Sequence, residues 1–153
     1  MTMKAIQDHY PPSFAHCYGC GPANPHGHHL KSYLLDERTE ARFTPDAIYS
    51  GGVPDNVYGG MIASLLDCHG TASAAAFAYR DRGRVMGDDG PPLRFVTASL
   101  QVDFRKPTPL GEELLITGTL RSLDGRKAQV SLSLSAGGVE CAHGEMLAIE
   151  LRA

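Results

Sequence analysis

The residues in this chain best suited to chemistry lie between Gly59 and Asp67. Glycines at the start of a helix let a ligand approach the backbone closely, because they carry no side chain. The first N–H groups of a helix have no carbonyl one turn earlier, and together with the helix dipole they favour negative charge. A helix that starts at Gly59-Gly60 would therefore stabilise a carbonyl oxygen that becomes an oxyanion.

Asp67 follows Gly60 by seven residues, which is about two turns further along a helix. The residues three and four positions away from it are all small: Ala63, Ser64, Gly70 and Thr71. A carboxylate is costly to bury unless it is paired or used, so Asp67 is a candidate for the acid of a ligand site. The pattern alone also allows Asp67 to be an ordinary surface residue of the helix or to bond a neighbouring backbone group.

The elements that must position these residues follow from periodicity. Apolar residues recur at helical spacing from Met61, and alanines continue the run, which predicts one helix of about 20 residues that ends near 80–83. Alternation of apolar and polar residues predicts strands at 30–35, 40–43, 96–104, 114–120, 130–134 and 141–151. Short turns such as Asp124-Gly125 favour antiparallel pairing. We therefore expect one α+β domain over residues 1–153, with an antiparallel sheet wrapped around one long central helix.

Three motifs resemble those of the hotdog-fold acyl-CoA thioesterases of the phenylacetate-degradation (PaaI-like) group and their human relatives. Tyr58-Gly59-Gly60 is similar to the His-Gly-Gly triplet that opens their helix, and Asp67 falls on the helix acid nine residues later. Residues 97–111 look like the long strand after the helix, with its Pro-x-Pro-Leu-Gly exit. Many members also share, in similar form, the early motif Cys17-x-x-Cys20-Gly21-x-x-Asn24-Pro25-x-Gly27.

The resemblance implies a hotdog fold and hydrolysis of an acyl thioester to a carboxylate and free CoA, with no metal or organic cofactor. It implies that Asp67 acts as general base or nucleophile and that the Gly59 N–H is the oxyanion donor. In several members a Thr or Ser supplied across the dimer interface orients water or the acid, and Thr97 matches that position. Members act as homodimers, often as dimers of dimers (homotetramers), with sites at the subunit interface, so we expect the same here.

Tyr58 stands where the family has histidine, and we include it in the expected catalytic set. A tyrosine hydroxyl can still donate a hydrogen bond. However, tyrosine is larger than histidine and has no second ring nitrogen. The alternative function is therefore a non-hydrolytic protein that binds acyl-CoA or an acyl carrier on the same fold.

Substrate contacts are expected from Gly60, Asn56 and Ser64, which lie beside the predicted catalytic groups in the sequence. Arg105 and Lys106 suit the phosphates of CoA, because arginine and lysine bind phosphate oxygens well. The alternative for Ser64 is a hydroxyl that bonds a carbonyl one turn back in the helix. The alternative for the two basic residues is a place on a solvated strand edge or turn.

The cysteines and histidines raise a zinc hypothesis. Cys17-x-x-Cys20 is followed by His26, His28 and His29, and these are suitable ligand types. No second pair with zinc spacing follows, so the alternative is a structural loop set by glycine and proline, and we expect no metal. Adjacent Cys68 and His69 suggest a thiol nucleophile with its base. Neighbours in a helix point about 100° apart, so the two side chains do not share a face, which favours a packed thiol and a core or capping histidine.

The composition excludes several classes. The 153 residues fit one domain, and 42% hydrophobic residues are enough for a core. A net charge of −3 argues against a nucleic-acid binder. No stretch approaches the roughly 20 apolar residues that span a bilayer, and the N-terminus lacks the features of a signal peptide. We therefore expect a cytoplasmic protein with reduced thiols that acts on acyl-CoA and on neither nucleic acid nor membrane.

Overall fold

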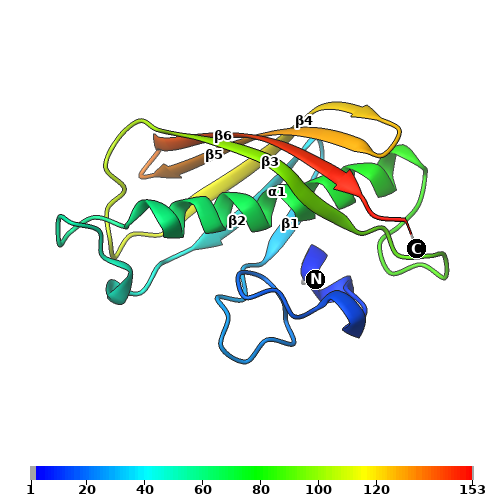
Figure 1. The fold of residues 1–153 in the computed structure, drawn as a ribbon, viewed down its shortest axis with the longest axis horizontal. Coiled ribbons are helices and arrows are strands. Elements are labelled where there is room, and N and C mark those ends of the chain that lie inside the picture. The colour runs from blue at the N-terminus through cyan, green and yellow to red at the C-terminus, as the bar shows by residue number, and fades with distance from the viewer. Residues whose placement is uncertain (1–2, 153) are drawn as a thin grey trace.

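The computed structural model describes residues 3–152 and is organised around one long helix, α1, which spans Gly59–Asp81. The six strands are β1 (Ser32–Leu35), β2 (Arg38–Phe43), β3 (Phe95–Phe104), β4 (Leu114–Asp124), β5 (Lys127–Ala136) and β6 (Val139–Glu150). They form one antiparallel sheet in the order β1-β2-β4-β5-β6-β3, which wraps around α1 (Figure 1). This arrangement confirms the predicted α+β hotdog fold.

The strands after the helix are longer than the sequence pattern predicts. The strand expected to end at Leu120 continues as β4 to Asp124, because the predicted hairpin turn brings Asp124 opposite Lys127 and so extends the pairing with β5. Gly125 supplies the positive φ of 59° that this turn requires. The hairpin was therefore predicted one residue too early: its two turn residues are Gly125 and Arg126, and Asp124 is the last residue of β4. The polar residues next to the turn hid the ends of the strands.

Helix α1 is buried along most of its length and on more than one face. Leu65, Leu66 and Phe77 expose 1% or less of their surface. A helix that is apolar all round must be covered on all sides. The sheet covers one side, and the N-terminal segment, with its short 3-10 helices η1 (Ile6–His9) and η2 (Pro12–Phe14), lies on the side of α1 away from β5 and β6 (Figure 1). Within residues 3–152, no helix is both long and apolar enough to cross a membrane.

A buried polar network ties α1 to the short strands β1 and β2. The side chain of His69 is fully buried, with Nδ1 2.8 Å from Ser32 Oγ and Nε2 3.0 Å from Thr39 Oγ1. Gln7 Nε2 donates to Ser32 Oγ at 3.0 Å, and Ser73 Oγ lies 2.6 Å from Thr39 Oγ1. Both ring nitrogens therefore have partners, as a buried imidazole requires. The prediction of a core histidine at position 69 is confirmed.

Candidate active site

Asp67 and Thr97 are brought together by α1 and β3. Thr97 Oγ1 donates a hydrogen bond to Asp67 Oδ1 at 2.5 Å. The register of β3 against β6 shifts between Thr97 and Ser99, and a bulge of this kind redirects nearby side chains. Asp67 is half-buried and Thr97 is exposed, so the bonded pair remains accessible to a ligand.

This pairing corrects one expectation about Thr97. The resemblance implied that the threonine reaches the acid from the neighbouring subunit, but Thr97 bonds Asp67 of its own chain. The physical reason is that β3 packs directly along α1 after the chain returns from the helix. Asp67 therefore needs no second copy to obtain its hydroxyl partner.

A cavity of about 490 Å³, the Asp67 cavity, opens beside this pair. Its walls come from three parts of the chain, namely α1, the first residues of β3 and the N-terminal segment. They include Tyr10, Phe14, Cys17, Cys20, Asp67, Cys68, Thr71, Val96 and Thr97. The cavity therefore places a carboxylate and its hydroxyl partner beside apolar rings and three thiols.

The N-terminal end of α1 lies at a second cavity of about 320 Å³, the Gly59 cavity. The Tyr58 carbonyl accepts hydrogen bonds from the Met61 N–H at 3.1 Å and the Ile62 N–H at 3.4 Å. In the described part of the chain, no acceptor is found for the N–H of Gly59 or Gly60, the first two residues of the helix. Free N–H groups at a helix start favour an anion.

The Gly59 cavity also collects several residues expected to bind substrate. Asn56, Arg105 and Lys106 line it together with Gly59. Arg105 is partly engaged, because its Nη1 lies 2.7 Å from Glu140 Oε1. Ser64 matches the alternative prediction of a hydroxyl that bonds within the helix. Its Oγ donates to the Gly60 carbonyl one turn back at 3.0 Å.

The two cavities are separate in one chain, which corrects the expectation that one helix supplies both groups to the same thioester. Gly59 and Asp67 are eight residues apart, a rise of about 12 Å along the axis. A reacting carbonyl must lie about 3 Å from both the base and the oxyanion donor. The Gly59 N–H and the Asp67 carboxylate of a single chain therefore cannot act on one carbonyl group.

Tyr58 caps the helix without a side-chain hydrogen bond. Its ring folds back over the first turn, so that a Cβ added at Gly60 would lie 2.4 Å from Tyr58 Cε2. The ring also stacks on Tyr49, with 6.4 Å between the centroids, and remains 42% exposed. Gly60 is therefore needed for this tyrosine to pack as it does.

Cys68 is the site residue that sequence reasoning missed. It is buried as predicted, but it lies beside Cys17 and Cys20 rather than only in the core. His28, one of the proposed zinc ligands, instead packs against Tyr49, whose hydroxyl lies 3.3 Å from His28 Nδ1. The only hint in the sequence was a cysteine next to the candidate acid, and no spacing rule connects it to the distant Cys-x-x-Cys loop.

Comparison with known proteins places these features in a family. Residues 55–142, which include α1, Asp67 and Thr97, match the family model described as the thioesterase superfamily. The chain belongs to the thioesterase superfamily. The resemblance inferred from the three motifs is therefore confirmed.

Solved structures and a curated relative agree with this membership. A thioesterase-superfamily protein from Shewanella loihica is 40% identical, covers 94% of this chain and 100% of its own, and superposes with a TM-score of 0.70. PaaI of Escherichia coli is 16% identical, with 82% of each chain covered and a TM-score of 0.66, and shares the fold. Acyl-coenzyme A thioesterase THEM4 of Rattus norvegicus is 31% identical over 66% of this thioesterase-superfamily chain, which spans only 37% of that relative.

Proposed function

We propose that this thioesterase-superfamily protein is an acyl-CoA thioesterase that hydrolyses an acyl thioester to a carboxylate and free CoA. The observation that carries the proposal is the Asp67 carboxylate, held by the Thr97 hydroxyl at 2.5 Å on the wall of the Asp67 cavity. The name of the rat relative, an acyl-coenzyme A thioesterase, supports the choice of substrate.

In the proposed reaction, Asp67 takes a proton from a water molecule whose oxygen attacks the thioester carbon. The carbonyl oxygen becomes an oxyanion, stabilised by the Gly59 N–H at the positive end of a helix. Collapse of this intermediate breaks the C–S bond, and the CoA sulfur takes up the proton. Direct attack by the carboxylate, followed by hydrolysis of the resulting anhydride, gives the same products.

A second copy of the chain is needed in this proposal, because Gly59 and Asp67 line different cavities of one chain. Strand β3 is an edge of the sheet and has ten residues, so its outer edge can pair with another strand. Phe104 at the end of β3 and Tyr58 at the helix start are exposed apolar side chains that a partner would cover. We infer a homodimer in which Gly59 of one copy meets Asp67 of the other, alone or within a homotetramer.

Mixing two inactive variants tests the shared site. Gly59→Pro removes the proposed donor, because proline has no N–H, and proline is well tolerated at the first position of a helix. After unfolding and refolding an equal mixture with Asp67→Asn, half of the dimers contain one chain of each kind. We expect about one quarter of the wild-type rate, since each mixed dimer regains one of its two sites. No recovery in mixtures shown to contain mixed dimers would contradict a site built from two chains.

Thiol release from a panel of short, medium, long and aryl acyl-CoAs tests the function itself. We expect release of one thiol per acyl-CoA consumed. The acyl-CoA that is hydrolysed fastest identifies the preferred acyl chain. Tight CoA binding without release from any member of the panel would instead support the non-hydrolytic binding protein. That alternative rests on one observation, the tyrosine at position 58 in place of the family's histidine.

The hydroxyl of Tyr58 is the only polar group that this side chain can offer to substrate. We expect Tyr58→Phe to lower kcat by up to about tenfold, the effect of losing one neutral hydrogen bond. Tyr49→Phe is the matched control, because it keeps the stacked pair of rings and removes a hydroxyl that lines neither cavity and lies 3.3 Å from His28 Nδ1. An unchanged kcat in Tyr58→Phe would show that the ring acts by packing alone.

A further inference from the structure

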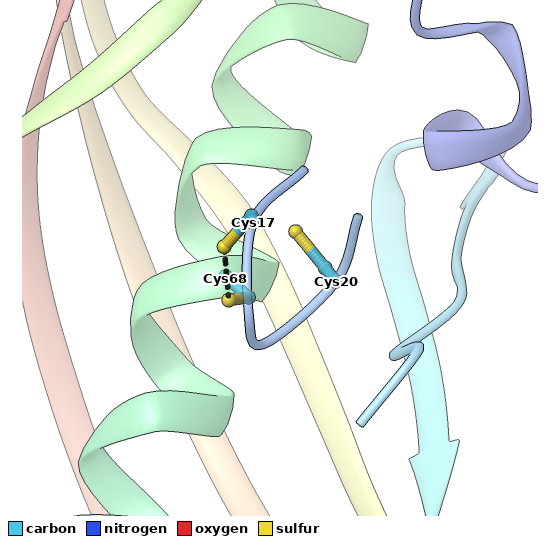
Figure 2. A group of neighbouring side chains, drawn as sticks. All are labelled: Cys17, Cys20 and Cys68. Atoms are coloured by element: carbon cyan, nitrogen blue, oxygen red, sulfur yellow. Dashed lines mark hydrogen bonds between the residues drawn. The ribbon is translucent and has the colours of Figure 1, made fainter. Parts of the chain in front are cut away.

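Three of the four cysteines meet on one wall of the Asp67 cavity. Cys17 and Cys20 come from the N-terminal loop, and Cys68 projects from α1 toward them (Figure 2). All three sulfur atoms lie within 4.8 Å of one another, and Cys17 Sγ is 3.7 Å from Cys68 Sγ. The remaining cysteine, Cys141, lies in β6 and its thiol donates to the Val139 carbonyl instead.

The loop is held tightly in this position by its backbone. The Gly21 N–H donates to the Cys17 carbonyl at 2.7 Å, and the Leu30 N–H donates to the Gly19 carbonyl at 3.1 Å. A Cβ at Gly19 would lie 2.3 Å from Cys68 Sγ, and one at Gly21 would lie 2.3 Å from the Cys17 nitrogen. Both glycines are therefore required for the loop to bring its thiols against the helix.

The spacing of the sulfur atoms fits a shared metal ion. Zinc binds thiolate sulfur at about 2.3 Å in tetrahedral geometry, which places neighbouring sulfur atoms about 3.8 Å apart. The 3.7 Å between the Cys17 and Cys68 sulfur atoms matches this spacing, and the third sulfur is close enough to complete one face of the tetrahedron. A disulfide requires about 2.05 Å, so the resting geometry is nearer to metal ligation than to a covalent bond.

We propose that Cys17, Cys20 and Cys68 bind one thiophilic divalent cation, such as Zn²⁺, which fastens the N-terminal loop to α1 beside Asp67. Three protein ligands leave a fourth position for water. Soft sulfur ligands select Zn²⁺ over Mg²⁺ or Ca²⁺, which prefer oxygen. The ion would stabilise the loop wall of the cavity, a role distinct from the proposed hydrolysis at Asp67.

The test uses Co²⁺, a coloured substitute for Zn²⁺, with the reduced protein. We expect a thiolate-to-cobalt charge-transfer band and the visible bands of a tetrahedral ion, both saturating at one equivalent and abolished by Zn²⁺. We expect Cys17→Ser, Cys20→Ser and Cys68→Ser each to weaken Co²⁺ binding more than about 100-fold, since even losing an outer partner of a ligand costs 10–100-fold. Cys141→Ser is the control and should bind as the wild type does.

Because Cys17 is exposed, Cys17→Ser tests the site without disturbing the core, and circular dichroism checks the fold of the other variants. Absence of a cobalt band in the wild type, or wild-type binding by Cys17→Ser, would overturn the proposal. A Cys17–Cys68 disulfide that forms readily in protein unable to bind cobalt would also overturn it, and would make the cluster a redox pair. Neither cobalt binding nor disulfide formation is measured through thioesterase activity. The experiment therefore tests the metal site independently of the proposed function.

Discussion

Asp67→Asn is expected to lower kcat for acyl-CoA hydrolysis by about 10²–10⁴-fold, the range for losing a general base. Asparagine has the same shape, and its carbonyl oxygen can still accept the hydrogen bond that Thr97 donates to Asp67 Oδ1. The fold and the cavity should therefore survive while the ability to take a proton is lost. Steady-state thiol release at saturating substrate measures the effect, and KM should change much less than kcat.

Asp81→Asn is the matched control for this prediction. Asp81 lies on the same helix, exposed at its C-terminal end, about 21 Å beyond Asp67 along the axis. The variant Asp81→Asn replaces a carboxylate with an amide outside both cavities, so its kcat should equal that of the wild type. Undiminished turnover by Asp67→Asn would remove Asp67 from the mechanism even if the protein proved to be a thioesterase.

Acidification is expected to destabilise the fold through His69. Burial lowers the pKa of this imidazole from 6.5 to about 4. Between these two values the unfolded chain binds a proton that the folded chain excludes, so the free energy of unfolding falls as the pH decreases from about 6.5 to about 4. Over this whole pH range, the contribution of His69 to the free energy of unfolding falls by about 3 kcal/mol. Urea unfolding at a series of pH values, with a chelator present, measures it.

The variant His69→Asn separates this contribution from those of other groups. Its amide cannot titrate but can still bond Ser32 from near the position of Nδ1, so the variant should be less stable at pH 7 and lose less stability on acidification. His26→Asn is the control, because His26 is exposed in the loop and its replacement should leave the pH dependence unchanged. Parallel stability curves for wild type and His69→Asn would show that His69 is not the group responsible.

The fold was predictable because local patterns and global packing agree in this chain. The alternation in residues 96–104 predicts a strand, and the helical spacing after Met61 predicts a helix. An apolar helix must be buried, and the sheet is the only large surface that can cover it. The exact ends of strands were less predictable, since they depend on which partner a residue such as Asp124 meets across the hairpin. Hydrogen bonding to a neighbouring strand is not encoded in local hydrophobicity.

The candidate site was predictable only in its separate parts. The glycine pair marked the free helix N-terminus, and the family resemblance drew attention to Asp67 and Thr97. No pattern in the sequence indicated that the threonine and the acid bond within one chain, or that Gly59 opens a different cavity. Both facts depend on the path of β3 along α1 and on the axial rise of the helix.

The sequence by itself therefore determined which residues can do chemistry, namely a helix acid, free N–H groups at Gly59-Gly60 and a Cys-x-x-Cys loop, because residue type and local conformation are short-range properties. Only the tertiary structure decided which of them meet. Asp67 pairs with Thr97 across 30 positions, and Cys17 meets Cys68 across 51. The physical reason is that such contacts arise from packing the N-terminal loop and β3 against one buried helix, and packing is a property of the whole chain.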